Sequence, residues 1–296
     1  MQFDLICMEC QLRRQRLAVE QQPDREKARQ YLRDCMEIMC TAPAGVAAPW
    51  LNPRFTEAWN RYFPAVDRYE KNKRDSNEYA LSRENAIAAR IAAAPDPLYA
   101  ALCFARIGNY LDFAALGDTV GFETLDALTE QALTDCRIDP AEYENFRAEL
   151  ERGGNLLYLT DNAGEIVYDK LLLLEIAKRY PQITRTVAVR GGNALNDATR
   201  ADAELCGLSS AATVTDTGVN IPGTQLDACS KEFQATFAAA DVILAKGQAN
   251  FETLWGCGAN VYYLFLCKCE LFTNLFRVPK LTGMFVCERR IDPPKA

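Results

Sequence analysis

Residues 155–180 read NLLYLTDNAGEIVYDKLLLLEIAKRY, and this stretch decides the fold of the chain. It opens with an apolar run at 156–159, which has the length and composition of a buried strand. It ends with 166–180, where Leu171, Leu174 and Ala177 recur at helical spacing. Between them lies a polar turn with Gly164, where the backbone must bend sharply. A strand that leads through such a turn into a helix is typical of open α/β sheets, which bind ligands at this edge.

Strand-like and helical runs alternate through the rest of the chain, which predicts a mostly parallel sheet with helices on both faces. The expected strands are 156–159, 186–189, 213–215, 242–245, 261–266 and 283–286. Before residue 153 the pattern is helical, and the run at 72–94 has the Ala, Glu and Arg content of a solvent-facing helix. We therefore predict a helical amino-terminal domain, 1–152, packed on a Rossmann-like α/β domain, 153–296.

Composition narrows the possible functions. The chain of 296 residues is 49% hydrophobic and 25% charged, as ordinary soluble proteins are. Its net charge of −7 argues against nucleic-acid binding, and no apolar run is long enough to span a membrane. The amino terminus lacks a secretion signal, so we expect a cytoplasmic protein in which most of the 12 cysteines are reduced. The absence of histidine excludes a Ser-His-Asp triad and a histidine metal cluster.

Three oxygen-bearing side chains follow the first two expected strands. Asp161 and Asn162 end the first strand, and Asp197 closes the turn after the second. The carboxyl ends of parallel strands share one edge, so these side chains should converge there. Two carboxylates and an amide suit a hard divalent cation such as Mn²⁺, Co²⁺, Ni²⁺ or Mg²⁺. Each Asp taken alone also fits helix N-capping, but the set favours a metal site.

Cationic side chains follow two of the expected strands. Lys246 ends the fourth and is suited to a phosphate, while the neighbouring Gly247 lets the backbone approach it. Arg190, beside two glycines after the second strand, offers another anion contact. Together with the metal set these residues predict phosphoryl chemistry, with Asp161 and Lys246 as catalytic residues. The motif leaves open whether Asp161 is a nucleophile or only a metal ligand.

Four ordered blocks, 161–165, 191–197, 216–224 and 246–252, resemble the signatures of the damage-control phosphatases, formerly domain-of-unknown-function family 89. The stretch 108–113 and the pair Cys7 and Cys10 resemble the branch with an amino-terminal CxxC. The resemblance implies metal-dependent hydrolysis of surplus or damaged phosphometabolites by a helical portion packed on a Rossmann-like core. It also implies that the metal ligands fall on Asp161, Asn162 and Asp197, and the phosphate-binding lysine on Lys246. Ala249 departs from the family, which usually has glycine there.

The substrate should meet residues from both halves of the chain. Asn109 and Asp112 are three residues apart in an expected helix, where they share one face toward the cleft. Gly108 before them implies close packing or a ligand, because glycine inside a helix costs about 1 kcal/mol. The predicted substrate-binding residues are Asn109, Asp112, Glu165, Arg190, Asp216 and Lys246.

The pair Cys7 and Cys10 has three interpretations. A structural zinc site would need two more ligands, from Cys35 and Cys40 or a carboxylate. A redox pair would need a strand directly before it, and the residues before Cys7 have only weak strand character. Reduced thiols without a metal are the third interpretation. For the whole chain we predict a metal-dependent phosphatase for small phosphorylated metabolites. The alternative is a sensor that binds metal and phosphate without turnover.

Overall fold

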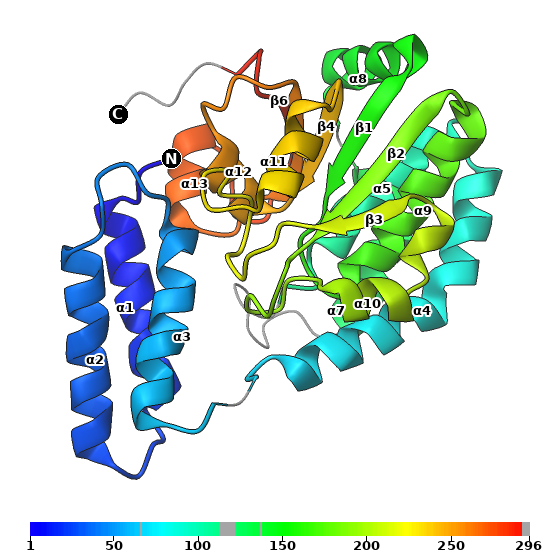
Figure 1. The fold of residues 1–296 in the computed structure, drawn as a ribbon. Helices are drawn as coiled ribbons and strands as arrows, with labels where there is room; N and C mark the ends of the chain where they lie inside the picture. The colour runs from blue at the N-terminus through cyan, green and yellow to red at the C-terminus, as the bar shows by residue number, and fades with distance from the viewer. Residues whose placement is uncertain (66, 113–121, 137, 292–296) are drawn as a thin grey trace.

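One sheet of mostly parallel strands forms the centre of the molecule (Figure 1). The computed structural model describes residues 1–65, 67–112, 122–136 and 138–291. Within these residues the strand order is β3-β2-β1-β4-β5-β6, and only β6 runs antiparallel to its neighbour. The strands are β1 Gly154–Leu159, β2 Ile183–Val189, β3 Thr213–Asp216, β4 Val242–Lys246, β5 Val261–Leu266 and β6 Gly283–Cys287. The predicted mostly parallel sheet is confirmed.

The strand order reverses beside β1. From β1 the chain builds outward to β2 and β3, and then returns to β4 on the other side of β1. Leu159 at the end of β1 lies opposite Ala188 of β2 and Ala245 of β4. A crevice opens at the carboxyl ends of strands where the order reverses. The turns after β1 and β4 therefore meet at the position where such folds bind ligands.

Helices cover both faces of the sheet, as predicted (Figure 1). Alternate residues of each strand face opposite sides, so Tyr158 and Leu244 belong to one buried cluster and Leu157 and Ile243 to the other. The first cluster includes helices α4 Glu70–Ala93, α5 Pro97–Gly108, α7 Phe122–Asp135, α8 Pro140–Arg152, α9 Glu165–Arg179, α10 Arg200–Leu205 and the 3₁₀ turn η3 Leu208–Ser210. The second includes α11 Lys231–Ala238, α12 Gln248–Leu254 and α13 Glu270–Phe276.

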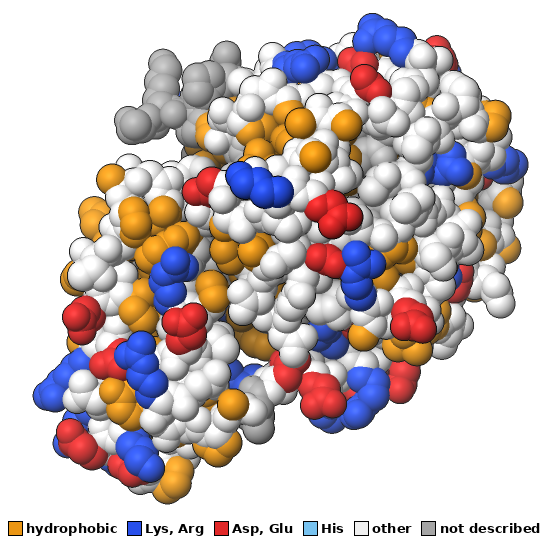
Figure 2. All heavy atoms as spheres, viewed as in Figure 1, with side chains coloured by type: hydrophobic (Ala, Val, Ile, Leu, Met, Phe, Trp, Pro, Cys, Tyr) orange, Lys and Arg blue, Asp and Glu red, His pale blue; other side chains and the backbone are white. Residues whose placement is uncertain are grey.

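The first three helices form a bundle with its own core. They are α1 Leu5–Val19, α2 Arg25–Cys40 and α3 Leu51–Tyr62, with the 3₁₀ turn η1 Ala48–Trp50 before α3. Tyr31, Trp59 and Phe63 pack edge-on or tilted at its centre. On the face in Figure 2, hydrophobic side chains gather where the bundle meets the rest, and charges of both signs are intermixed. The hydrophobic cores thus divide after α3, whereas the division at 152 and 153 stays a prediction of the sequence pattern.

Two expectations about the helices need correction. The helix α4 faces solvent on one side only, because its other side packs on α9 and buries Ser76 and Asn77. Gly164 makes this approach possible, since a Cβ there would lie 2.6 Å from the Ser76 carbonyl oxygen. The helix α5 ends at Gly108, so Asn109 and Asp112 do not share a helical face. Phe113, which ends the expected block 108–113, lies outside the described residues.

No helix in the described part of the chain has both the length and the apolar character needed to cross a bilayer.

Candidate active site

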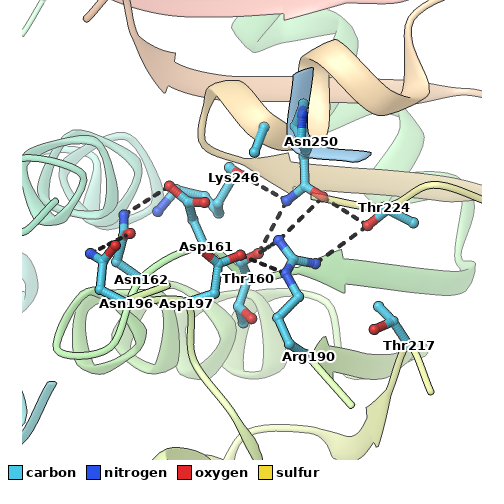
Figure 3. Close-up of polar contacts among 12 residues, drawn as sticks. Thr160, Asp161, Asn162, Arg190, Asn196, Asp197, Thr217, Thr224, Lys246 and Asn250 are labelled. Carbon is cyan, nitrogen blue, oxygen red and sulfur yellow. Dashed lines mark hydrogen bonds and ion pairs between the residues drawn. The ribbon is translucent and has the colours of Figure 1, made fainter. Parts of the chain in front are cut away.

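The turn after β1 presents Asp161 in a tightly packed setting (Figure 3). Its Oδ2 atom accepts hydrogen bonds from the side-chain amides of Asn109, at 2.9 Å, and Asn162, at 2.8 Å. Gly247, just after β4, has a φ of 79°, and a Cβ there would lie 2.0 Å from Asp161 Oδ2. Glycine is therefore required at residue 247 both for the left-handed backbone and for the space that the carboxylate occupies.

The turn from β2 to α10 lies beside the turn after β1 and is hydrogen-bonded to it. Asn162 and Asp197 form an antiparallel bridge, and the Asn196 amide donates to Asn162 Oδ1 at 2.8 Å. The Ala198 N–H donates to the Asp161 carbonyl oxygen at 2.8 Å. These bonds bring the three predicted metal ligands, Asp161, Asn162 and Asp197, onto adjacent turns at the end of the sheet. Asn162 Oδ1 keeps a second lone pair, because a carbonyl oxygen has two.

Lys246 lies beneath this turn and is wholly buried. Its Nζ donates to Glu165 Oε1 at 2.6 Å, Asp169 Oδ1 at 2.6 Å and the Ala105 carbonyl oxygen at 2.9 Å. An ammonium group has three donors, so protein acceptors use all of them. Glu165 in turn accepts from Asn109 and Asn162. In this conformation Lys246 therefore orders the carboxylates under Asp161 and presents no free donor to a phosphate.

The site holds more carboxylates than cations. Burial, and then the charges of Glu165 and Asp197, raise the pKa of Asp161 well above its ordinary value. Burial raises the pKa of Asp197 to about 6, although the Arg190 guanidinium opposes it. Among the described residues of this cluster, five carboxylates face three cations: Asp112, Asp161, Glu165, Asp169 and Asp197 against Arg190, Lys246 and Lys268.

A divalent cation fits this donor set. Two charges of surplus carboxylate in a buried site call for a compensating cation, since an unpaired buried charge is costly. No hydrogen bond within the described chain reaches Asp161 Oδ1, which leaves that oxygen for an ion. The expected set has two carboxylates and an amide, and the described residues hold no group of three or more Cys, Asp or Glu side chains placed to bind a metal. Asn162 would therefore have to supply the third ligand.

Lys268 is a site residue that sequence reasoning missed. It follows β5 by two residues, and its Nζ pairs with Asp112 Oδ2 at 2.7 Å. The Lys268 charge lowers the pKa of Asp161, whereas that of Asp112 raises it, so both act on the site. The signal that could have found it is its position just after an expected strand, close to where Lys246 stands at the end of another.

Other predicted residues have different surroundings from those expected. The Arg190 side chain is fully buried, and its Nε donates to Asp197 Oδ2 at 2.6 Å. Its Nη2 donates to the Thr160 carbonyl oxygen at 3.0 Å, so Arg190 positions Asp197 and offers no exposed anion contact. Asp216 pairs with Arg200 and accepts from the Gly218 N–H at 2.8 Å, away from the cluster. Protein partners engage both side chains in this conformation, and substrate contact by Arg190 or Asp216 stays a prediction.

Asn109 and Asp112 both reach the cluster. Asn109 donates to Asp161 and Glu165, and its Oδ1 accepts from the Leu266 N–H at 3.1 Å. This amide positions two carboxylates, and substrate contact by Asn109, Asp112 or Glu165 stays a prediction. Sequence reasoning also missed Asn77, which accepts from the Gly164 N–H at 2.6 Å and so anchors the turn from α4.

The cysteines give little support to a zinc site in the bundle. Cys7 and Cys10 lie on α1, whereas Cys35 is buried in the bundle core and Cys40 is exposed at the end of α2. Burial raises the pKa of Cys7 to about 12, so the thiol form is favoured. Cys103 and Cys136 form a disulfide, and the cysteines recorded as free are Cys7, Cys10, Cys35, Cys40, Cys206, Cys229, Cys257, Cys267, Cys269 and Cys287.

Comparisons with known proteins agree with this architecture. The chain is 38% identical over 192 residues to the damage-control phosphatase PH1575 of Pyrococcus horikoshii, covering 64% of each chain. It is 32% identical over 207 residues to a damage-control phosphatase of Archaeoglobus fulgidus, covering 69% of this chain and 70% of the relative. An uncharacterized protein of Methanocaldococcus jannaschii is 34% identical over 167 residues, which are 54% of its length.

A solved structure extends the similarity over almost the whole chain. The crystal structure of a Pyrococcus horikoshii protein of domain-of-unknown-function family 89 superposes with a TM-score of 0.81 and 29% identity. The superposition covers 97% of this chain and 98% of that one. The family model of the damage-control phosphatase ARMT1-like domain matches residues 5–282. The chain therefore belongs to the ARMT1-like damage-control phosphatase family.

Proposed function

We propose that the protein is a metal-dependent phosphatase that hydrolyses phosphate monoesters of small metabolites, with sugar phosphates as the default class. The observation that carries the proposal is the surplus of carboxylates around Asp161 and Asp197, on the turns after β1 and β2 at the reversal of strand order. Such a site is suited to bind a divalent cation, and the bound cation can in turn bind a phosphate. Family membership supports the same activity.

Asp161, Asn162 and Asp197 would hold the ion. When bound, the ion would neutralise phosphate oxygens and so stabilise the charge of the transition state. Asp161 Oδ2 already accepts two amide hydrogens, so Oδ1 is left either to bind the ion or to attack phosphorus. We assign Oδ1 to the ion and the attack to a water molecule. Arg190 fixes the direction of Asp197 through the Nε hydrogen bond.

The lysines divide the remaining work. Lys268 supplies the cation for the phosphate, because its only hydrogen-bond acceptor among the described side chains is Asp112 at the rim of the cluster. Lys246 pairs with Glu165, and Glu165 holds the two amides that orient Asp161. In the reaction a P–O bond forms to water while the ester P–O bond breaks. The alcohol then leaves with a proton from that water.

Turnover of p-nitrophenyl phosphate and of a sugar-phosphate panel tests the proposal, with Mn²⁺, Co²⁺, Ni²⁺ or Mg²⁺ added after chelation. Asp161→Asn and Asp197→Asn should each lower kcat/KM by about two orders of magnitude or more, since each weakens the ion site. Asp227→Asn is the control, because Asp227 is exposed and is not one of the cluster carboxylates, and it should change kcat/KM less than twofold. Activity that survives chelation would refute metal dependence.

The alternative is a sensor that binds metal and phosphate without turnover. A folded, metal-loaded sample that hydrolyses nothing on the panel would favour it. We also propose that Cys7 and Cys10 place the chain in the branch with an amino-terminal CxxC, and that the protein works in the cytoplasm. Fractionation of cells that express the tagged protein tests the location.

A further inference from the structure

A cavity of about 360 Å³ lies between the helical bundle and the loop that carries Asp197. Its wall comes from α1, α3, the segment before α4 and this loop, through Arg14, Asn52, Phe55, Arg68, Tyr69 and Leu195 among others. In Figure 1 the bundle stands beside the loops at the carboxyl edge of the sheet. The volume is within the range of small-molecule sites, which is about 300–1,000 Å³.

This cavity shares a loop with the proposed ion site. Leu195 lines it, and the next residue, Asn196, donates to Asn162 at 2.8 Å. Leu195 has a φ of 55°, a left-handed conformation that costs a non-glycine residue about 1–3 kcal/mol. The loop is nevertheless held there, because the Ala163 N–H donates to the Asn196 carbonyl oxygen at 2.9 Å. Consecutive residues thus face the cavity on one side and the metal ligands on the other.

The charged side chains that line the cavity are both arginines. The Arg68 guanidinium lies over the Trp59 ring, 4.5 Å from its centroid, and Arg14 projects from α1. In the described part of the chain neither forms an ion pair with a carboxylate, whereas Arg16 and Arg61 of the same bundle do. The charge of Arg14 also acts on the Glu252 carboxylate of α12, whereas no described carboxylate pairs with Arg68. In a chain of net charge −7, two cations without an ion pair among the described residues make this cavity a local site for an anion.

We propose that the cavity binds a second anionic group of the substrate, while the cluster around Asp161 binds the phosphate that is hydrolysed. The preferred substrates are then small phosphometabolites with two anionic ends, such as sugar bisphosphates or phosphorylated sugar acids. The inference rests on the proposed phosphatase function and adds the substrate class. Arginine suits this task, because its planar guanidinium can bind a carboxylate or a phosphate through two hydrogen bonds.

Matched substrates and matched variants test the inference. The substrates are 6-phosphogluconate against glucose 6-phosphate, fructose 1,6-bisphosphate against fructose 1-phosphate, and p-nitrophenyl phosphate as a reference with a single anion. The variant Arg14→Gln/Arg68→Gln removes the cationic wall. The control Arg13→Gln/Arg33→Gln removes the same charge from exposed positions of the same bundle.

The wild type should prefer the substrate with two anions in each pair. The cavity variant should lose about 10- to 100-fold in kcat/KM for those substrates, mainly through KM, because each arginine contact to an anion is a charge-assisted bond. It should change p-nitrophenyl phosphate turnover less than twofold, and the control should behave as the wild type. A wild type without the preference, or equal losses in the two variants, would overturn the inference and leave the phosphatase proposal intact.

Binding decides the matter if the wild type hydrolyses nothing. In that case the phosphatase proposal has failed, and calorimetric titration with 6-phosphogluconate measures the cavity directly. At least tenfold weaker binding to the cavity variant than to the control supports the anion site. Equal affinities overturn it.

Discussion

Lys246 ends β4 and Lys268 follows the neighbouring strand β5. Both side chains are buried, yet their surroundings differ. Lys246 has three acceptors, two of them carboxylates on α9. Lys268 has the Asp112 carboxylate, which is itself 13% exposed. The comparison shows that a lysine at the end of a strand can either hold other side chains of the site in place or face the ligand. Among the described residues, the number of protein acceptors around the lysine nitrogen distinguishes the two.

The largest expected effect is on stability, from Lys246→Met. This change leaves Glu165 and Asp169 buried without their cation, which costs roughly 3–5 kcal/mol. Urea unfolding of the metal-free protein measures it, and Lys231→Met is the control because Lys231 is exposed on α11. A loss below about 1 kcal/mol would remove Lys246 from the supporting role and return it to the phosphate.

Lys268→Met should act mainly on activity. We expect kcat/KM for p-nitrophenyl phosphate to fall about 100- to 1,000-fold, because a fixed cation opposite the phosphate is lost. The loss of stability should be smaller than for Lys246→Met, since Asp112 keeps contact with water. Kinetics and urea unfolding on the same preparations compare the two lysines. Normal turnover in this variant would contradict the assignment of Lys268 to the phosphate.

A double substitution tests whether Lys246 and Asp169 stabilise each other. Adding Asp169→Asn to Lys246→Met removes one of the two stranded carboxylates, so about 1–2 kcal/mol of the lost stability should return. Asp169→Asn alone should destabilise, because it leaves Lys246 with one carboxylate. Unfolding free energies of the four proteins form a double-mutant cycle. Strict additivity would mean that the Lys246–Asp169 pair contributes nothing.

The strands and turns that carry this site could be predicted from the sequence, whereas most contacts between its side chains could not. The strands at 156–159 and 242–245 were expected within one residue or two of β1 and β4, because buried parallel strands are continuous apolar runs. The convergence of Asp161, Asn162 and Asp197 followed from the parallel order alone. The partners of Lys246 did not follow, since Asp169 is 77 residues away and reads as an ordinary polar position of a helix.

The helical half shows the same limit. Composition suggested an exposed α4, but one side of this helix is buried, and Ser76 on that side packs against Gly164. The end of α5 at Gly108 is set by packing against Glu165 and Tyr168, to which a Cβ would come within 3.2 Å. Neither contact leaves a periodic signal in the sequence, because both join segments that are far apart in the chain.

Glu252 on α12 is a carboxylate whose charge is only partly balanced by its neighbours. Its substitution has the smallest expected effect on stability. Burial raises its pKa from 4.5 to about 7, and the Met1 ammonium, Gln248 and Arg14 only partly oppose this. Between these values the unfolded chain ionises before the folded one does. The stability linked to this group is therefore fully present below pH 4.5 and is lost as the pH rises through about 7.

Glu252→Gln removes this dependence. Relative to the wild type, the variant should gain about 1–2 kcal/mol of stability between pH 5 and pH 8, because only the wild type must ionise a half-buried carboxyl over that range. Glu232→Gln, at an exposed position of α11, should give no such trend. Urea unfolding at both pH values measures the difference. If the difference in unfolding free energy between Glu252→Gln and the wild type is the same at both pH values, the Met1 ammonium fully balances the Glu252 charge. Glu252 would then resemble Lys246, whose charge is balanced by Glu165 and Asp169.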